Sequence, residues 1–344
     1  MKVAFRLDAS QTQGVGHLVR CLVLADAISA QGGQCVFILN HMDEAAQRAW
    51  GNSAHDIRTL ALAANSGWEA DAAATRENLP EQIDWLICDH YGLDARWEKA
   101  LGDAARQLLV IDDLANRPHA CHALVDPGLT RTALDYHPWM EVPAQLMLGT
   151  QYALLKPAYA TLHNAAPVWP SVSKAHLFFG GGAQAAWLPL YAERLLMAQP
   201  GLKVHAIGQA DAHSMLALNQ RFKQRLDWTP YVDNMALTYT ECDLAFGSPG
   251  TATWERACVG LPSGLIATAD NQVPILQSLD RQGFCRYLGE AQRLESSTFE
   301  HALNRFLSDQ TSLTAMRSMG VKSVDGLGVQ RIVSAMISMS CQHA

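Results

Sequence analysis

A histidine beside two glycines is the first residue whose type and position predict chemistry. His17 follows Gly14 and Gly16 and precedes an almost wholly apolar stretch, residues 18–30. This pattern predicts a glycine turn that leads into a helix, with His17 in the first helical turn. Because the positive end of the helix dipole disfavours an imidazolium, the ring is expected to be neutral near pH 7 and able to accept a proton. Arg20, three residues further on, would face the same ligand.

A second glycine-containing turn lies in the other half of the chain. Residues 246–255 (FGSPGTATWE) place small residues and three hydroxyl groups before a predicted helix. Free backbone N–H groups and the positive end of a helix suit a diphosphate. Glu255 is placed to accept hydrogen bonds from the vicinal hydroxyls of a ribose, and Asn271 and Gln272 carry amides that can reach hydroxyl or acetamido groups of a sugar.

Polar clusters follow the predicted strands of the first half, at residues 89–92 (DHYG), 112–113 (DD) and 126–128 (DPG). Ligands of open parallel sheets bind beyond the carboxyl ends of the strands, which is where these clusters fall. Asp89 and His90 either orient a water or the sugar, or have their hydrogen bonds made by the backbone of a local turn. Tyr91 is the candidate for direct contact with the substrate. For Asp112 and Asp113, capping of the next segment is favoured over acid–base chemistry.

A metal centre is the alternative interpretation of these polar residues. The candidate ligands lack the compact spacing of known metal sites, so we expect no metal. They are Asp89, His90, Asp112, Asp113, His119 and His122.

The elements that must position these residues are strands alternating with helices. In the first half the expected strands are Lys2–Leu7, Gln34–Leu39, Trp85–Cys88, Leu108–Ile111 and Ala123–Val125, and the expected helices include Ala45–Trp50 and Trp97–Arg106. The second half repeats this pattern with strands at Ala175–Phe179, Lys203–Ile207, Leu244–Phe246 and Ser263–Ile266 and with the turn Gly180-Gly181-Gly182, which either contacts substrate or only permits a tight turn. Such alternation predicts parallel sheets built from βαβ units.

The domain boundary is expected within residues 164–173 (NAAPVWPSVS), where two prolines interrupt the periodic pattern. We therefore predict an α/β protein with two Rossmann-like, doubly wound parallel-sheet domains, residues 1–165 and 172–344, and a ligand held in a central cleft between them. The last apolar helix, about Val329–Met339, would be able to pack back across both halves.

Composition narrows the possible functions. The chain has 344 residues, of which 49% are apolar and 17% charged, as in a well-packed soluble protein. A net charge of -7 and the lack of a basic stripe argue against a nucleic-acid partner. The eight cysteines are scattered and form no CxxC pair, which predicts a cytoplasmic protein. No apolar run approaches ~18 residues, so we expect no membrane span. A monomer is compatible with the sequence.

Several motifs, taken in order, resemble a known family. The turn before Glu255, with Pro262 and Asn271-Gln272, resembles the nucleotide-sugar half of the GT-B superfamily, close to the MurG-like UDP-N-acetylglucosamine transferases. The amino-terminal motifs resemble the PseG family, the UDP-2,4-diacetamido-2,4,6-trideoxy-β-L-altropyranose hydrolases of pseudaminic acid synthesis. These motifs are Phe5–Ser10, Gly14–His17, Arg20–Leu22, Asp89–Gly92, Ile111–Asp113 and Tyr152–Leu155. Lys156-Pro157 departs from the arginine and acidic residue expected next.

The resemblance implies a GT-B fold and hydrolysis of the bond between the anomeric carbon and the UDP oxygen, with His17 as general base and no metal or organic cofactor. It also implies that the free sugar enters pseudaminic acid biosynthesis, which serves flagellin glycosylation or surface polysaccharide. The predicted substrate-binding residues are Asp8, Gly14, Gly16, Arg20, Tyr91, Gly181, Ser248, Gly250, Thr251, Ala252, Thr253, Glu255, Asn271 and Gln272.

Two other functions are compatible with the same motifs. A GT-B glycosyltransferase would replace water by an acceptor hydroxyl, although no basic or apolar amphipathic patch marks a dock for a lipid acceptor. A non-catalytic nucleotide-sugar sensor or biosynthetic subunit would keep the fold without turnover. The intact His17 beside both glycines disfavours that function.

Overall fold

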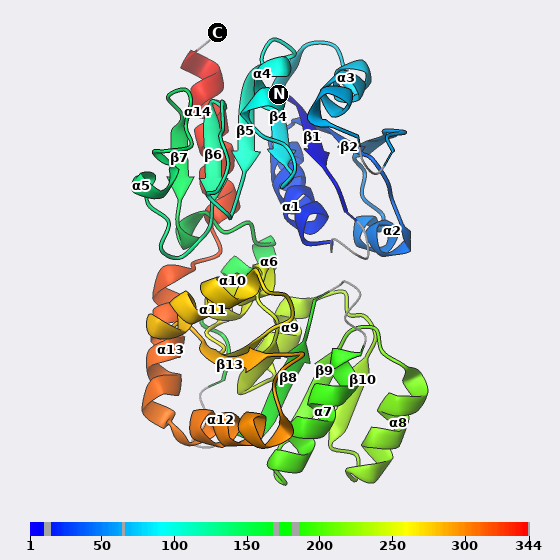
Figure 1. Cartoon of the computed structure of the whole chain (residues 1–344), viewed down its shortest axis with the longest axis vertical. Helices are drawn as coiled ribbons and strands as arrows, with labels where there is room; N and C mark the ends of the chain where they lie inside the picture. The colour runs from blue at the N-terminus through cyan, green and yellow to red at the C-terminus, as the bar shows by residue number, and fades with distance from the viewer. Residues whose placement is uncertain (10–14, 64–65, 168–171, 181–185, 343–344) are drawn as a thin grey trace. The chain divides into compact units, whose positions relative to one another are not determined.

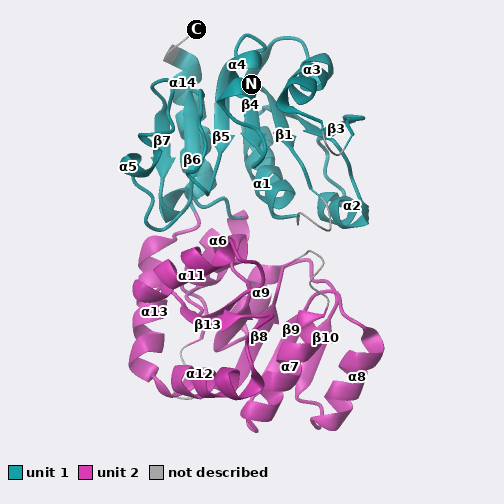
Figure 2. Ribbon diagram, in the orientation of Figure 1, with its two compact units in different colours: residues 1–155, 327–344 teal, residues 156–326 magenta. Residues whose placement is uncertain are grey.

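The computed structural model of the protein describes residues 1–9, 15–63, 66–167, 172–180 and 186–342 (Figure 1). The chain forms two compact units, Met1–Leu155 with Leu327–Ala344, and Lys156–Gly326 (Figure 2). Each unit is built on its own parallel sheet with helices on its faces, so the predicted architecture of two doubly wound α/β domains is confirmed.

The first unit contains a seven-stranded sheet in the order β3-β2-β1-β4-β5-β6-β7. Its strands are β1 (Lys2–Leu7), β2 (Gln34–Leu39), β3 (Asp56–Thr59), β4 (Ile83–Asp89), β5 (Ala105–Ile111), β6 (Ala123–Asp126) and β7 (Gln145–Leu148). Its helices are α1 (Gly16–Ala30), α2 (Glu44–Trp50), α3 (Trp68–Asn78), α4 (Ala95–Ala100), α5 (Ala133–Tyr136), the 3₁₀ turn η1 (Thr150–Tyr152) and α14 (Gly328–Gln342). The strand order reverses between β1 and β4, which makes this pair the topological switch point of the sheet.

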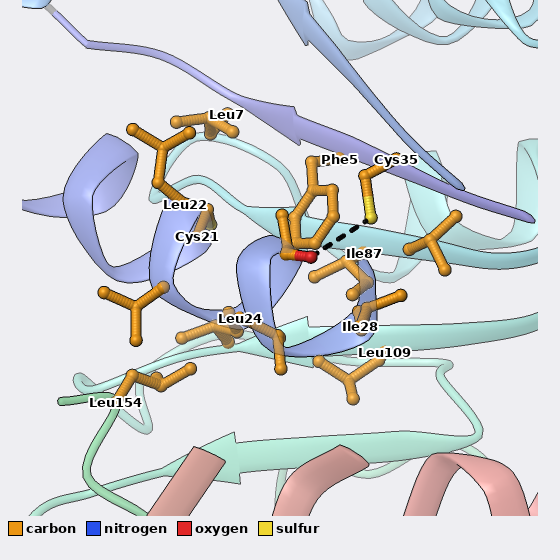
Figure 3. Packing of buried hydrophobic residues seen from close by; sticks show 14 of the residues in the cluster. Phe5, Leu7, Cys21, Leu22, Leu24, Ile28, Cys35, Ile87, Leu109 and Leu154 are labelled. Carbon is orange, nitrogen blue, oxygen red and sulfur yellow. Dashed lines mark hydrogen bonds between the residues drawn. The ribbon is translucent and has the colours of Figure 1, made fainter. Parts of the chain in front are cut away.

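The core of the first unit follows the two-residue period of its strands. On β1, Phe5 and Leu7 face α1, whose Leu24 and Ile28 are buried against them (Figure 3). Ala4, which directly precedes Phe5 on the strand, joins the cluster on the opposite face of the sheet, where Trp97 is fully buried. Both faces of the strands are therefore covered, as a parallel sheet requires, and each large apolar side chain contributes about 1.5–3 kcal/mol by burial.

The second unit contains a six-stranded sheet in the order β10-β9-β8-β11-β12-β13, whose switch point lies between β8 and β11. Its strands are β8 (Lys174–Phe178), β9 (Lys203–Ile207), β10 (Leu226–Thr229), β11 (Leu244–Gly247), β12 (Ser263–Ala267) and β13 (Arg286–Glu290). Its helices are α6 (Pro157–Thr161), α7 (Trp187–Ala198), α8 (Ala212–Arg221), α9 (Met235–Thr240), α10 (Thr251–Val259), α11 (Gln272–Arg281), α12 (Ser296–Ser308) and α13 (Gln310–Ser323).

Some bounds differ from those expected from the sequence. The helix expected at Trp97–Arg106 ends at Ala100, because β5 already begins at Ala105. The short strand β3 lies at the exposed edge of its sheet, where side chains carry no inside–outside alternation that a sequence pattern could reveal. Among the described residues, none of the helices is long and apolar enough to cross a bilayer.

The division between the units also differs from the expected one. The first unit ends at Leu155 rather than within residues 164–173, and it regains the carboxy-terminal segment from Leu327 onwards. Helix α14 belongs to the first unit because Val329, Ile332, Val333 and Met336 are buried in the same cluster as α1. Positions 164–173 thus fall within the range of the second unit, Lys156–Gly326.

Candidate functional site

The switch point of the first sheet brings the His17 region and the cluster at residues 89–92 together. Strands β1 and β4 are hydrogen-bonded neighbours, with Leu7 paired to Asp89. Helix α1 begins at Gly16, after the segment that follows β1, and β4 ends at Asp89 (Figure 1). The carboxyl ends of two adjacent strands therefore present His17 and Asp89 at one edge of the sheet.

The ring of His17 is held by the carboxylate of Asp89. His17 Nδ1 lies 2.5 Å from Asp89 Oδ1, and the His17 side chain is 14% exposed while that of Asp89 is 1% exposed. An ionised carboxylate can only accept, so Nδ1 must carry the proton of this hydrogen bond. In the neutral ring the lone pair then lies on Nε2. Within the described residues, no hydrogen-bond partner occupies Nε2, which leaves that atom able to take a proton.

Asp89 is kept ionised by its buried arginine partner. Burial alone would raise the pKa of Asp89, but the charge of Arg20, with a smaller contribution from His17, holds that pKa well below its usual range. Arg20 donates from Nε to Oδ2 at 2.7 Å and from Nη2 to Oδ1 at 2.6 Å, a two-pronged contact. Such paired contacts between guanidinium and carboxylate fix geometry as well as charge. Arg20, predicted to face the ligand, thus acts here through Asp89.

A second carboxylate extends this network toward solvent. Asp113 Oδ2 accepts from Arg20 Nη1 at 3.0 Å and from the Tyr91 hydroxyl at 3.2 Å. Tyr91 is 46% exposed, and its ring meets the His17 ring edge to face, with ring centroids 4.7 Å apart. Tyr91 therefore lies beside His17 and is partly exposed.

His90 differs from His17 in that both of its ring nitrogens are occupied. Its Nδ1 accepts from the Gly92 backbone N–H at 3.0 Å, so Nε2 carries the proton that is donated to Asp8 Oδ2 at 3.1 Å. Asp8 also accepts from Arg6 Nη1 at 2.6 Å and from the Asn40 backbone N–H at 3.1 Å. Asp8 thus lies at the same edge of the sheet as His17, but its oxygens are already engaged by the protein.

Asp112, His119 and His122, the other residues considered as metal ligands, make contacts within the protein. Asp112 Oδ2 accepts from the Ala115 backbone N–H at 2.8 Å, which is the capping role favoured from the sequence. His119 Nδ1 bonds to Glu98 Oε1 at 2.7 Å in the interior, and His122 Nδ1 accepts from the Leu108 backbone N–H. In the described part of the chain, no three His, Cys, Asp or Glu side chains are grouped as a metal ion would require.

In the second unit, the loop between β11 and α10 depends on two glycines. Gly247 has φ +151°, and a Cβ there would lie 1.7 Å from the carbonyl oxygen of Phe178, so no other residue fits at the end of β11. Gly250 has φ +126° and is the N-cap of α10. The first N–H groups of the helix, those of Thr251 and Ala252, have no earlier helical carbonyl to bond. This loop therefore presents donors to an anion.

Two of the three hydroxyls predicted on this loop, those of Ser248 and Thr253, are turned toward the protein. Ser248 is buried, and its hydroxyl donates to the carbonyl oxygen of Phe179 at 2.9 Å. Thr253 is buried as well: its N–H bonds to the Gly250 carbonyl, and its hydroxyl has no partner among the described residues. Ser248 thus ties the loop to the end of β8. Neither the Ser248 nor the Thr253 hydroxyl is therefore presented outward, whereas the first backbone N–H groups of α10 remain as donors.

Glu255 lies one turn into α10, between two tyrosines. Its Oε2 accepts from the Tyr239 hydroxyl at 3.3 Å. Burial raises the pKa of Glu255. The hydrogen bond from Tyr159, the charge of Arg256 and the hydrogen bond from Tyr239 oppose this effect, because each of them lowers that pKa. The carboxylate is therefore held in one orientation near the N-terminus of α10.

The remaining predicted residues are placed as follows. Asn271 is exposed at the N-cap of α11. Gln272 Oε1 accepts from the backbone N–H of Thr268 at 2.8 Å, so its carbonyl closes the β12–α11 turn. Gly16 is exposed and a Cβ there would meet open space. Gly14 and Gly181 lie outside the described residues.

Asp89 and Asp113 are absent from the predicted catalytic and substrate-binding residues, although Asp89 was one of the two residues expected either to orient a water or the sugar or to be satisfied in a local turn. Asp89 belonged to a recognised cluster, but its role depends on β4 lying next to β1, which the sequence pattern does not determine. Asp113 adjoins Asp112 in the sequence yet faces Arg20 and Tyr91 instead of capping.

Comparisons with known proteins agree with this fold. No family model matches the chain. The crystal structure of Acinetobacter baumannii MurG superposes with a TM-score of 0.66 at 13% identity, covering 98% of this chain and 100% of that one. The Medicago truncatula protein UGT71G1 complexed with UDP-glucose gives a TM-score of 0.64 at 8% identity, covering 97% and 98%. The chain therefore has the GT-B fold, as predicted.

Curated proteins give partial sequence matches. The UDP-2,4-diacetamido-2,4,6-trideoxy-beta-L-altropyranose hydrolase of Campylobacter jejuni is 28% identical over 158 residues, 45% of this chain. The match spans about half of that protein's length, 52%. The Bacillus subtilis spore coat polysaccharide biosynthesis protein SpsG is 19% identical and covers 97% of both chains. A Rickettsia felis UDP-N-acetylglucosamine–N-acetylmuramyl-(pentapeptide) pyrophosphoryl-undecaprenol N-acetylglucosamine transferase is 34% identical over 28% of this chain and 30% of its own.

Proposed function

We propose that the protein hydrolyses a UDP-linked 2,4-diacetamido-2,4,6-trideoxyhexose and releases the free sugar and UDP. The observation that carries this proposal is the hydrogen bond of 2.5 Å from His17 Nδ1 to Asp89 Oδ1, which leaves Nε2 as the acceptor. A neutral imidazole oriented by a carboxylate is suited to general-base catalysis. The resemblance in sequence to the Campylobacter jejuni hydrolase supports the altrose-configured sugar as substrate and pseudaminic acid synthesis as its destination.

In the proposed reaction, water attacks the anomeric carbon while His17 Nε2 takes its proton. The bond from the anomeric carbon to the β-phosphate oxygen breaks, and its electron pair stays on UDP. The backbone donors at the start of α10 stabilise the charge that grows on the diphosphate. Glu255 accepts hydrogen bonds from the ribose, and Tyr91 contacts the sugar.

The experiment that tests this proposal is turnover of the UDP-sugar without any acceptor. The wild type is expected to release free sugar, whereas His17→Ala should lose about 10²–10⁴-fold in rate and bind UDP with unchanged affinity. Glu255→Ala is the complementary variant, because it should weaken UDP binding. Equal turnover by the wild type and His17→Ala would remove the proposed mechanism.

A glycosyltransferase is the second candidate, favoured by the partial match to the Rickettsia felis transferase. It predicts that sugar is transferred to an added acceptor hydroxyl and that little free sugar forms without one. A non-catalytic subunit predicts UDP binding with no turnover under either condition.

A further inference from the structure

A buried arginine lies beneath the β11–α10 loop. Arg256 is in α10, directly after Glu255, and its side chain is 0% exposed. Its Nη2 donates to the backbone carbonyl of Ser248 at 3.1 Å. Nε and Nη1 have no hydrogen-bond partner in the described part of the chain. Among the described residues, the hydrogen bond of this guanidinium therefore leads into the loop that ends at the N-cap Gly250.

A desolvated guanidinium is costly unless a negative charge compensates it. The neighbouring carboxylate, Glu255, directs Oε2 to the Tyr239 hydroxyl. Described residues supply no carboxylate within hydrogen-bond distance of Arg256. The structure thus contains a buried positive charge beside a loop whose backbone N–H groups also favour an anion.

We propose that Arg256 is a positioning residue for the diphosphate of the bound nucleotide, whose negative charge complements a guanidinium that no carboxylate in the described part of the chain reaches by hydrogen bond. This inference rests on the proposed function, which assigns UDP to the β11–α10 loop. Because Arg256 is fully buried, it acts without touching the ligand. Its charge attracts the diphosphate through the loop, and its hydrogen bond turns the Ser248 carbonyl oxygen away from the phosphate oxygens.

The test compares a ligand that carries the diphosphate with one that does not. UDP affinity is measured by calorimetry and uridine affinity by NMR titration, for the full chain and for Arg256→Lys, Arg256→Gln and Arg256→Met. Loss of the charge in the Gln and Met variants should weaken UDP binding by about 10–100-fold and change uridine binding less than twofold. The Lys variant keeps the charge and should bind UDP within about threefold of the wild type.

Arg194 provides a matched control in the same unit. It lies on α7, stacks over the Tyr191 ring at 5.1 Å, and also has two buried nitrogens without a partner among the described residues. Arg194→Met removes the same charge away from the β11–α10 loop. This variant should leave UDP affinity within twofold.

The outcomes separate this inference from the proposed function. If the wild type binds UDP and Arg256→Met binds it equally well, the inference is wrong and the proposed function stands. Parallel losses for UDP and uridine would mean that Arg256 only supports the fold of the loop. A wild type that does not bind UDP would overturn both. If Arg256→Met fails to fold, the Lys and Gln variants, which differ mainly in charge, decide the question.

Discussion

Asp89 determines what His17 can do as a base, because it fixes which ring nitrogen carries the proton. Asp89→Asn replaces the carboxylate by an amide that can donate or accept, so the ring loses its fixed tautomer. We predict that kcat falls by about 10²–10⁴-fold, with UDP affinity unchanged and with Asp89→Glu retaining more activity than the Asn variant. Steady-state kinetics and UDP titration measure both effects.

His90 is the matched control for this prediction, since both of its nitrogens are engaged within the protein. His90→Gln should lose less than about tenfold in kcat, below the usual range for a general base. A loss equal to that of His17→Ala would show that the two histidines have been assigned the wrong roles. Thermal denaturation of each variant separates a loss of fold from a loss of chemistry.

At the residue scale the sequence indicated which residue types lie near the helix starts, but not which of them contact one another. The spacing of Gly14, Gly16 and His17 indicated a histidine at a helix start. Which polar group would meet that histidine depended on sheet order, and Asp89 could not be told from His90. Likewise, Ser248 and Thr253 were predicted to bind the diphosphate because they carry hydroxyls. The conformation of the β11–α10 loop instead turns both hydroxyls into the protein.

Among the elements, β8 carries a buried histidine that makes stability depend on pH. His176 is 0% exposed, and burial, with the charges of Arg256, His205 and Lys174, lowers its pKa well below the ordinary value of 6.5. The unfolded chain therefore binds more protons than the folded one below about pH 6.5. The contribution of His176 to the free energy of unfolding should therefore be constant above this pH, and it should decrease as the pH falls below it.

His176→Phe tests this prediction, because it keeps an aromatic ring beside Tyr239 but cannot be protonated. Between pH 7.5 and pH 5.5 the wild type should lose about 1.4 kcal/mol more of its unfolding free energy than the variant does. Urea denaturation at the two pH values measures the difference. An identical loss in both proteins would show that His176 is not the group responsible.

For the whole molecule, the carboxy-terminal helix α14 completes the first unit rather than the second. Ile332 is fully buried in the cluster around α1, whereas Ile337, on the same helix, is 42% exposed. We predict that Ile332→Ala lowers the unfolding free energy by about 2–5 kcal/mol and that Ile337→Ala changes it by less than ~0.5 kcal/mol. Chemical denaturation of both variants checks this. Equal effects would mean that α14 does not pack as described.

The division into two doubly wound halves was predictable, because the strand–glycine–helix pattern occurs at Lys2–Ala30 and again at Ala175–Leu196. The boundary was not. The prolines at 164–173 are a strong local signal for a break between secondary-structure elements. A domain, however, is defined by which segments, often distant in the sequence, are buried against one another. The apolar face of residues 329–339 indicated that α14 packs against something without indicating which unit provides the partner.

The most direct test of the proposed hydrolysis is the fate of the water oxygen. The UDP-linked diacetamido sugar is incubated with the protein in oxygen-18 water without an acceptor, and the products are followed by ¹H and ³¹P NMR. Attack at the anomeric carbon predicts free sugar together with UDP that contains no oxygen-18, and it predicts neither product at an appreciable rate with His17→Ala. Oxygen-18 in the UDP, or an intact substrate after prolonged incubation with the wild type, would contradict it.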